Sequence, residues 1–248
     1  MNKILEAAQA IATARRDRTP LRALAADVAP QNEADGYRIQ DAVHDLLAAD
    51  VGALVGYKIG CTSAVMQQYL GIPHPCAGGV FEKGVHASGV SLRHGDFVRV
   101  GVECEIAVRL GRDLAPSSAA FTAESVAGAI EAYHPAIEIV DDRYADWQTI
   151  GAPTLVADDF FAAACVLGAP VSRSIAPDLL DVVGCSARRF RAASRRICLM
   201  SSAAPSSTAS RPDAAPAPTY SVIRTPRWRG SPITLPPRAN TFAPARSC

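Results

Sequence analysis

The sequence predicts an α+β fold in which helices precede a body made mostly of strands. Apolar residues recur at helical spacing from Ile4 to about Leu47, and short β-type runs separated by turns dominate from Val51 onward. Strands and helices do not alternate strictly along the chain, so a doubly wound parallel sheet is not expected. A mixed sheet with N-terminal helices is the architecture that these two observations favour.

The expected elements follow in chain order. Helices occupy about residues 4–47 and are interrupted near Pro20 and Pro30. A strand over 51–60 ends in a glycine-flanked turn, and Thr62 or Ser63 is expected to cap a short helix that ends at Leu70. The remaining predictions are β-type runs over 79–81, 85–92 and 97–110, a helix over 122–134 that Pro135 ends, and a strand over 136–140.

Charge is distributed unevenly along the 248 residues. The formal net charge is +1, but residues 1–184 carry 14 basic and 23 acidic side chains, whereas residues 185–248 carry 11 arginines and one acid. Nine of the 18 prolines also lie in this last part. We therefore expect three segments, namely a helical segment over 1–50, an α+β body over 51–184 that carries the candidate site residues, and a disordered tail over 185–248.

Composition excludes several classes of protein. The longest apolar stretch, 160–171, falls short of the roughly 20 residues that a membrane-spanning helix needs. No signal-peptide pattern opens the chain, and the seven cysteines show no paired spacing and no Cys-x-x-Cys motif. We expect a cytoplasmic protein without membrane association, and three lysines with few aromatic residues give the body no nucleic-acid-binding signature.

The strongest chemical signal is a set of carboxylates on expected strands. Because strand side chains alternate, Glu103 and Glu105 share one face, which is typical either of a solvated edge strand or of a bound cation. Glu138 stands alone in an apolar strand, where an unpaired acid is costly to bury. Three carboxylates without a matching His or Cys cluster favour a hard cation such as Mg²⁺ or Mn²⁺.

Lys58 is the second candidate, since it is one of only three lysines and lies between Gly56 and Gly60. It is either a surface turn lysine or a positive charge that a tight backbone brings close to a substrate carboxylate. The sequence pattern alone leaves both interpretations open.

A series of motifs in a fixed order carries a family resemblance. They are GYKIGCT at 56–62, LGI at 70–72, GVF at 79–81, VECEIA at 102–107, DL at 113–114 and PAIEIV at 135–140, followed by Arg143 and Trp147. From its N-terminus to about Gly184 the chain resembles the fumarylacetoacetate hydrolase superfamily and, within it, the 2-keto-4-pentenoate hydratase group. The resemblance implies a mixed β-sheet roll with N-terminal helices, incomplete at the C-terminus of this chain.

The resemblance also implies a site and an activity. The implied ligands of Mg²⁺ or Mn²⁺, which also act in catalysis with Lys58, are Glu103, Glu105 and Glu138. The implied substrate contacts are Lys58, Gly60 and Arg143. The implied reaction adds water to 2-hydroxypenta-2,4-dienoate to give 4-hydroxy-2-oxopentanoate, a step in the catabolism of aromatic compounds, in a homo-oligomeric enzyme.

One motif departs from the family pattern. Hydratases of the group carry Pro-Asp-(Phe/Tyr)-Gly where this chain has Pro75-Cys76-Ala77-Gly78. The acid or base of the hydration step is therefore not assigned by resemblance. Acylpyruvate hydrolysis and 4-oxalocrotonate decarboxylation, which use the same enolate chemistry, stay open as alternatives.

Residues 185–248 match none of the segments with which family members continue. When its codons are shifted by one base, Ser221–Thr234 can encode LGHPxxALAWLANH, which resembles the family motif. We therefore expect a change of reading frame between about Pro170 and Thr208, which would leave this chain inactive. The alternative is a non-catalytic chain whose arginine-rich tail binds acidic partners.

Overall fold

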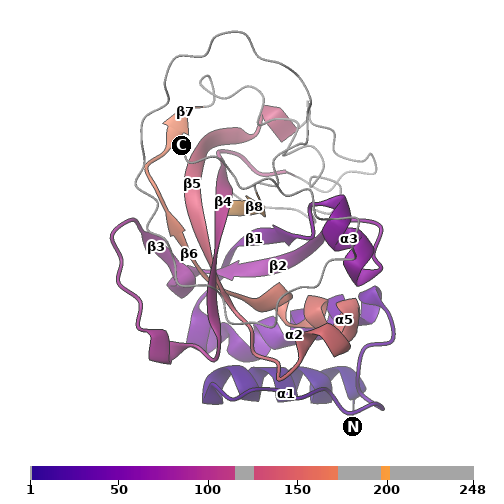
Figure 1. The fold of residues 1–248 in the computed structure, drawn as a ribbon. Coiled ribbons are helices and arrows are strands. Elements are labelled where there is room, and N and C mark those ends of the chain that lie inside the picture. The colour runs from indigo at the N-terminus through magenta and orange to yellow at the C-terminus, as the bar shows by residue number, and fades with distance from the viewer. Residues whose placement is uncertain (1, 115–125, 173–196, 202–248) are drawn as a thin grey trace, which may run out of the picture. The chain divides into compact units, whose positions relative to one another are not determined.

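The structure, a computed structural model, describes residues 2–114, 126–172 and 197–201, all of which lie in one unit, Met1–Ala203 (Figure 1). Its first elements are the helices α1 (Lys3–Asp17) and α2 (Glu33–Val51). The side chain of Asn2 caps α1 and that of Asn32 caps α2. Their apolar faces pack together, which confirms the helical spacing predicted for this segment.

The next part of the chain forms three short strands and one short helix. It contains β1 (Leu54–Gly60), α3 (Ala64–Leu70), β2 (Cys76–Phe81) and β3 (Val85–Ala87). Ser63 accepts a hydrogen bond from the Met66 amide and caps α3, as predicted. The predicted run over 85–92 is a strand only in its first three residues.

The two longest strands, β4 (Val100–Leu110) and β5 (Ile130–Asp141), pair antiparallel. The predicted helix over 122–134 is wrong for residues 130–134, which lie in β5, whereas residues 115–125 lie outside the described residues. Short apolar runs fit either periodicity, and pairing with β4 decides for the strand. Pro135 is tolerated inside β5 because it lies where the pairing of β5 changes from β6 (Ala162–Leu167) to β7 (Val171–Ser172).

The remaining regular elements are α5 (Gly151–Ala157) and β8 (Ile197–Ser201). Short 3-10 turns occupy Glu82–Gly84, His94–Asp96, Trp147–Thr149 and Asp159–Phe161. Residues 185–248 were expected to form no strand, but β8 lies within them. Its Ile-Cys-Leu-Met run is apolar and suits a strand that pairs on both sides, here with β1 and β4. The rest of the predicted tail, and with it the sequence affected by the proposed frame change, falls outside the described residues.

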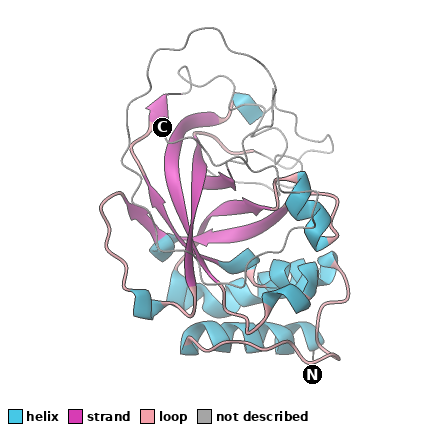
Figure 2. Ribbon diagram, viewed as in Figure 1, coloured by secondary structure: helices cyan, strands magenta, loops and turns pink. Residues whose placement is uncertain are grey.

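The strands form one mixed sheet in the order β2-β1-β8-β4-β5-β6-β3, with β7 beside β5. β8 runs parallel to β1, β3 runs parallel to β6, and the other pairs are antiparallel. Figures 1 and 2 show α1, α2 and α5 gathered at one end of this sheet. Helices segregated from a mixed sheet define an α+β fold, as predicted. Within the described ranges no helix is long and apolar enough to cross a membrane.

Candidate metal centre

The register of β4 and β5 brings the three predicted glutamates together. Glu103 lies directly opposite Glu138, and Glu105 lies two residues further along β4, so all three side chains leave the same face. One carboxylate oxygen from each lies within 4.8 Å of those of the other two. Glu105 and Glu138 are buried and Glu103 is exposed, which leaves the cluster open on one side.

Lys58 reaches this cluster from β1. Its Nζ lies 3.0 Å from Oε1 of Glu138, and both side chains are about 95% buried. In a flat sheet, three strand spacings of about 4.8 Å would hold the backbones of β1 and β5 roughly 14 Å apart. Because the side chains nevertheless meet, the sheet must curl so that β1 faces β5, and Lys58 is not a surface lysine.

The cluster is electrostatically strained without a further cation. The pKa of Glu105 is raised to about 8, mainly by burial and further by the neighbouring Glu138 and Glu103, while Lys58 opposes the shift. Burial also raises the pKa of Glu138, against the opposing effect of Lys58. Burial alone would lower the pKa of Lys58, but the charges of the glutamates outweigh it and the net shift is upward. One ammonium group therefore does not neutralise three carboxylates.

The donor set fits a hard divalent cation. Oε2 of Glu105 is buried and accepts no hydrogen bond from any described residue, which is unusual for a buried carboxylate oxygen. Three oxygen ligands on one face, with one side open, suit Mg²⁺ or Mn²⁺, which keep coordination positions for water or substrate. An ion at this position would supply the orphaned oxygen with a partner.

A left-handed turn at Asp159–Phe161 holds the second contact of Lys58. The Phe160 carbonyl accepts a hydrogen bond from Lys58 Nζ at 3.0 Å. The three turn residues have φ values of 55°, 47° and 67°, and each non-glycine residue in this region costs about 1–2 kcal/mol. Sequence reasoning missed this turn because no glycine marks it.

Buried charge pairs stabilise the turn. Oδ1 of Asp159 accepts hydrogen bonds from the Gly79 amide and from Nε2 of His44, each at 2.8 Å. Arg15, which comes from α1, donates to Asp158 at 2.6 Å and to Asp159 at 2.9 Å. The N-terminal helices thus contribute to the position of Lys58, which the pattern of apolar residues in α1 did not indicate.

The structure does not bring Arg143 to the three glutamates. Its Nε donates to Asp158 at 3.0 Å, and its other nitrogens donate to backbone carbonyls of Asp158, Phe161 and Ala162. Gly60 does lie beside Lys58, since a Cβ at this position would be 3.8 Å from Lys58 Cε. Contact of Gly60 or Arg143 with a substrate stays a prediction.

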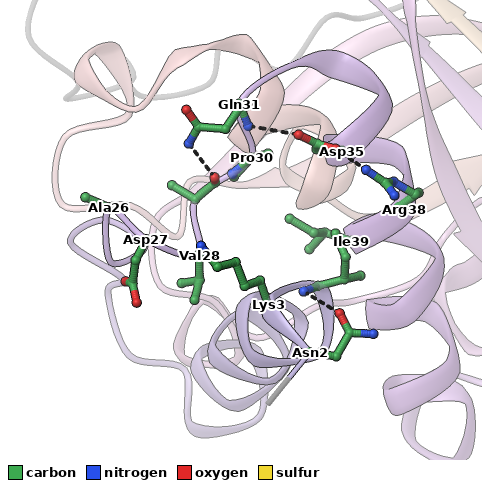
Figure 3. Close-up of a pocket in the computed structure, with 12 residues that line it drawn as sticks. Asn2, Lys3, Ala26, Asp27, Val28, Pro30, Gln31, Asp35, Arg38 and Ile39 are labelled. Atoms are coloured by element: carbon green, nitrogen blue, oxygen red, sulfur yellow. Dashed lines mark hydrogen bonds and ion pairs between the residues drawn. The ribbon is translucent and has the colours of Figure 1, made fainter.

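A cavity of about 530 Å³ lies apart from the centre, between the start of α1, residues 26–31 and the start of α2 (Figure 3). None of the three glutamates lines it. Two of its charged groups, Arg38 and Asp35, pair with each other, and the Gln31 amide also donates to Asp35. We therefore base the function on the glutamate cluster and not on this cavity.

The fold has a clear counterpart among solved structures. It matches 4-oxalocrotonate decarboxylase from Pseudomonas putida, complexed with magnesium and adipate, with a TM-score of 0.71 and 19% identity over 80% of this chain and 86% of that one. The chain therefore has a fold of the fumarylacetoacetate hydrolase type, as the resemblance implied.

Curated relatives narrow the class to a family, although no family model matches the chain. A 2-keto-4-pentenoate hydratase from Paraburkholderia xenovorans is 35% identical over 74% of this chain and 67% of its own length. One from Paraburkholderia phymatum is 34% identical over 70% of this chain and 63% of its own length. The chain belongs to the 2-keto-4-pentenoate hydratase family, and its similarity covers about two thirds of the length of these relatives.

Proposed function

We propose that the chain is a divalent-metal-dependent hydratase that converts 2-hydroxypenta-2,4-dienoate to 4-hydroxy-2-oxopentanoate in the breakdown of aromatic compounds. The observation that carries the proposal is the convergence of three glutamates with a buried lysine whose ammonium lies 3.0 Å from one of them. Family membership supports the class of substrate, a small 2-oxo or 2-hydroxydienoic acid.

The proposed chemistry follows from the charges at the site. Glu103, Glu105 and Glu138 would hold Mg²⁺ or Mn²⁺, which supplies a Lewis acid for the oxygen atoms of a 2-oxo acid. Lys58 would neutralise the substrate carboxylate or transfer a proton at Nζ. Burial of the ammonium strengthens this interaction, since little water competes for it.

The reaction balances with one water molecule. Ketonisation of the dienol moves the hydroxyl proton to C5 and leaves a C3=C4 double bond conjugated with the 2-oxo group. The oxygen of water then adds to C4 and a proton to C3. The contacts from Glu138 and from the Phe160 carbonyl orient the Lys58 ammonium before substrate arrives.

The direct test follows the loss of dienol absorbance when the purified chain receives 2-hydroxypenta-2,4-dienoate with Mg²⁺ or Mn²⁺. Turnover that a chelator abolishes supports the proposal. Separate assays with an acylpyruvate and with 4-oxalocrotonate test the two alternative reactions. A parallel protein with the reading frame restored between residues 170 and 208 separates a wrong function from a damaged chain. Intact metal binding in both proteins without hydration in either would refute the proposed reaction.

Metal binding should strengthen with pH and release protons. Because the pKa of Glu105 is raised to about 8 in the absence of an ion, this carboxyl holds its proton at pH 6.5 and must lose it to become a ligand. We expect Mn²⁺ affinity to rise by up to about tenfold per pH unit below 8 and then to level off. Calorimetric titration at pH 6.5 and 9, in two buffers of different ionisation enthalpy, measures both quantities, and a pH-independent affinity would contradict the proposed ligand.

Replacing Lys58 with methionine should separate catalysis from metal binding. The variant keeps the three carboxylates, so we expect Mn²⁺ to bind while hydration falls at least about 10²-fold in kcat/KM. Lys83→Met is the matched control, since Lys83 is exposed and donates to the backbone carbonyls of Ala49 and Asp50 at the end of α2. Equal activities of the two variants, measured in whichever form of the protein is active, would remove Lys58 from the mechanism.

A further inference from the structure

A second group of metal-binding side chains lies where the start of α2 meets the start of β2. Glu33 opens α2, His74 precedes β2 and Cys76 is the first residue of β2. One ligand atom of each lies within 4.8 Å of the other two. Cys76 is buried, whereas the side chains of Glu33 and His74 are 25% and 32% exposed, so an ion has a route from solvent.

The imidazole is oriented as in many metal sites. Nδ1 of His74 lies 3.3 Å from the Pro75 carbonyl oxygen, which can only accept, so this contact favours the proton on Nδ1. Nε2 then faces Oε2 of Glu33 at 3.2 Å. A histidine that donates from one ring nitrogen to a backbone carbonyl and directs the other toward a carboxylate has the orientation common among metal-binding histidines.

The backbone around the three ligands is anchored without any ion. The amide of Ala77, next to Cys76, donates to Tyr37 Oη at 3.0 Å, and its carbonyl accepts from Gln40 Nε2 at 3.0 Å. Both partners lie on α2, so the helix that carries Glu33 is tied to the strand that carries Cys76. These contacts hold the two segments together before an ion binds, so binding requires little further loss of conformational entropy.

We propose that Glu33, His74 and Cys76 bind a divalent cation of the zinc class. A thiolate, an imidazole and a carboxylate are ligands for Zn²⁺ or Co²⁺, unlike the three carboxylates of the first centre. Zinc bonds of about 2.0–2.3 Å place tetrahedral ligand atoms roughly 3.5 Å apart, so side-chain movements of about 1 Å close the cluster around an ion. Solvent would fill the fourth position, and the ion would cross-link α2 to the sheet.

Cobalt titration of the full chain tests this site separately from the glutamate centre. After treatment with a chelator, the protein receives excess Mg²⁺ and then Co²⁺, and thiolate ligation gives a near-ultraviolet charge-transfer absorption that carboxylates do not. We expect one equivalent of this signal, displaced by Zn²⁺. Loss of a hydrogen bond that supports a metal ligand typically weakens binding roughly 10–100-fold. His74→Gln removes the ligand itself, so it should weaken Co²⁺ binding by more than this. Cys76→Ser should abolish the absorption.

Matched controls keep the test decisive. Cys61→Ser and Cys104→Ser remove other cysteines and should retain the signal, as should Glu103→Gln, which alters only the first centre. Because Cys76 is buried, thermal unfolding of each variant is recorded, and the partly exposed His74 supplies a variant that does not depend on core packing. Absence of the absorption in the parent chain, or its persistence in Cys76→Ser, would overturn the proposal.

Discussion

Replacing Glu105 with glutamine should abolish divalent-metal binding at the β4–β5 face and lower kcat/KM for dienoate hydration by at least about 10³-fold, equivalent to about 4 kcal/mol. Glutamine keeps the shape of the side chain but supplies no negative charge. It also avoids the cost of burying an ionisable carboxyl beside Glu138 and Glu103, a cost that the raised pKa of Glu105 reflects, so the metal-free variant should unfold at the same temperature as the parent or higher. Three measurements test these effects: titration with Mn²⁺, thermal unfolding with and without Mn²⁺, and hydration kinetics. The kinetics use the chain itself or, if only that protein is active, the version with the restored reading frame.

The matched control is Glu131→Gln. Glu131 lies on β5 as Glu138 does, but it is exposed and outside the cluster, so Mn²⁺ affinity and activity should be unchanged. Thermal stabilisation by Mn²⁺ should disappear in the Glu105 variant and persist in the control. Unchanged Mn²⁺ affinity after Glu105→Gln would remove this residue from the centre, whatever the activity of the chain.

Strand alternation was sufficient to predict that Glu103 and Glu105 share a face, because a period of two needs no tertiary information. Glu138 stood out as a lone acid in an apolar strand, but its place beside the other two depended on the register of β4 against β5, which residue patterns do not specify. The contact of Lys58 with Glu138 depended in addition on the curl of the sheet. Residue patterns thus suggested the members of the site, and tertiary structure brought them together.

Two kinds of error have identifiable physical causes. The segment at Ile130–His134 fits a helical pattern locally and becomes a strand because β4 offers a partner along its whole length. The turn at Asp159–Phe161 opposes the local preferences of its residues, so no propensity argument could predict it. Glu33, His74 and Cys76 escaped notice because their spacing matches no short metal motif and a fold contact assembles them.

Arg15 provides the second large effect, because its guanidinium pairs with two buried carboxylates. Its side chain is 12% exposed and those of Asp158 and Asp159 are 1–2% exposed. Arg15→Gln would leave both acids with one cationic partner fewer, and breaking a buried pair in this way costs about 3–5 kcal/mol. Urea unfolding should therefore show a lower midpoint with an unchanged slope.

Arg16→Gln is the control on the next residue of α1. Arg16 and its partner Asp50 are 44% and 48% exposed, so the loss should be at most about 1 kcal/mol. The two variants remove the same charge from adjacent positions of one helix, and equal losses of stability would contradict the importance assigned to burial. Amine labelling adds a local measure, since Lys58 should become more reactive in Arg15→Gln while Lys3 and Lys83 do not change.

The pH dependence of the Arg15 effect has a defined sign. Burial alone would raise the pKa of Asp159, but the charges of His44 and Arg15 outweigh it, and the net pKa lies below the usual range. A folded-state pKa below the unfolded one contributes stability that is present at neutral pH and lost as pH falls from about 4. The stability difference between the parent and Arg15→Gln should therefore be full at pH 7 and shrink below pH 4. A difference that stayed constant to pH 3 would show that Arg15 acts through packing and not through the charge of Asp159.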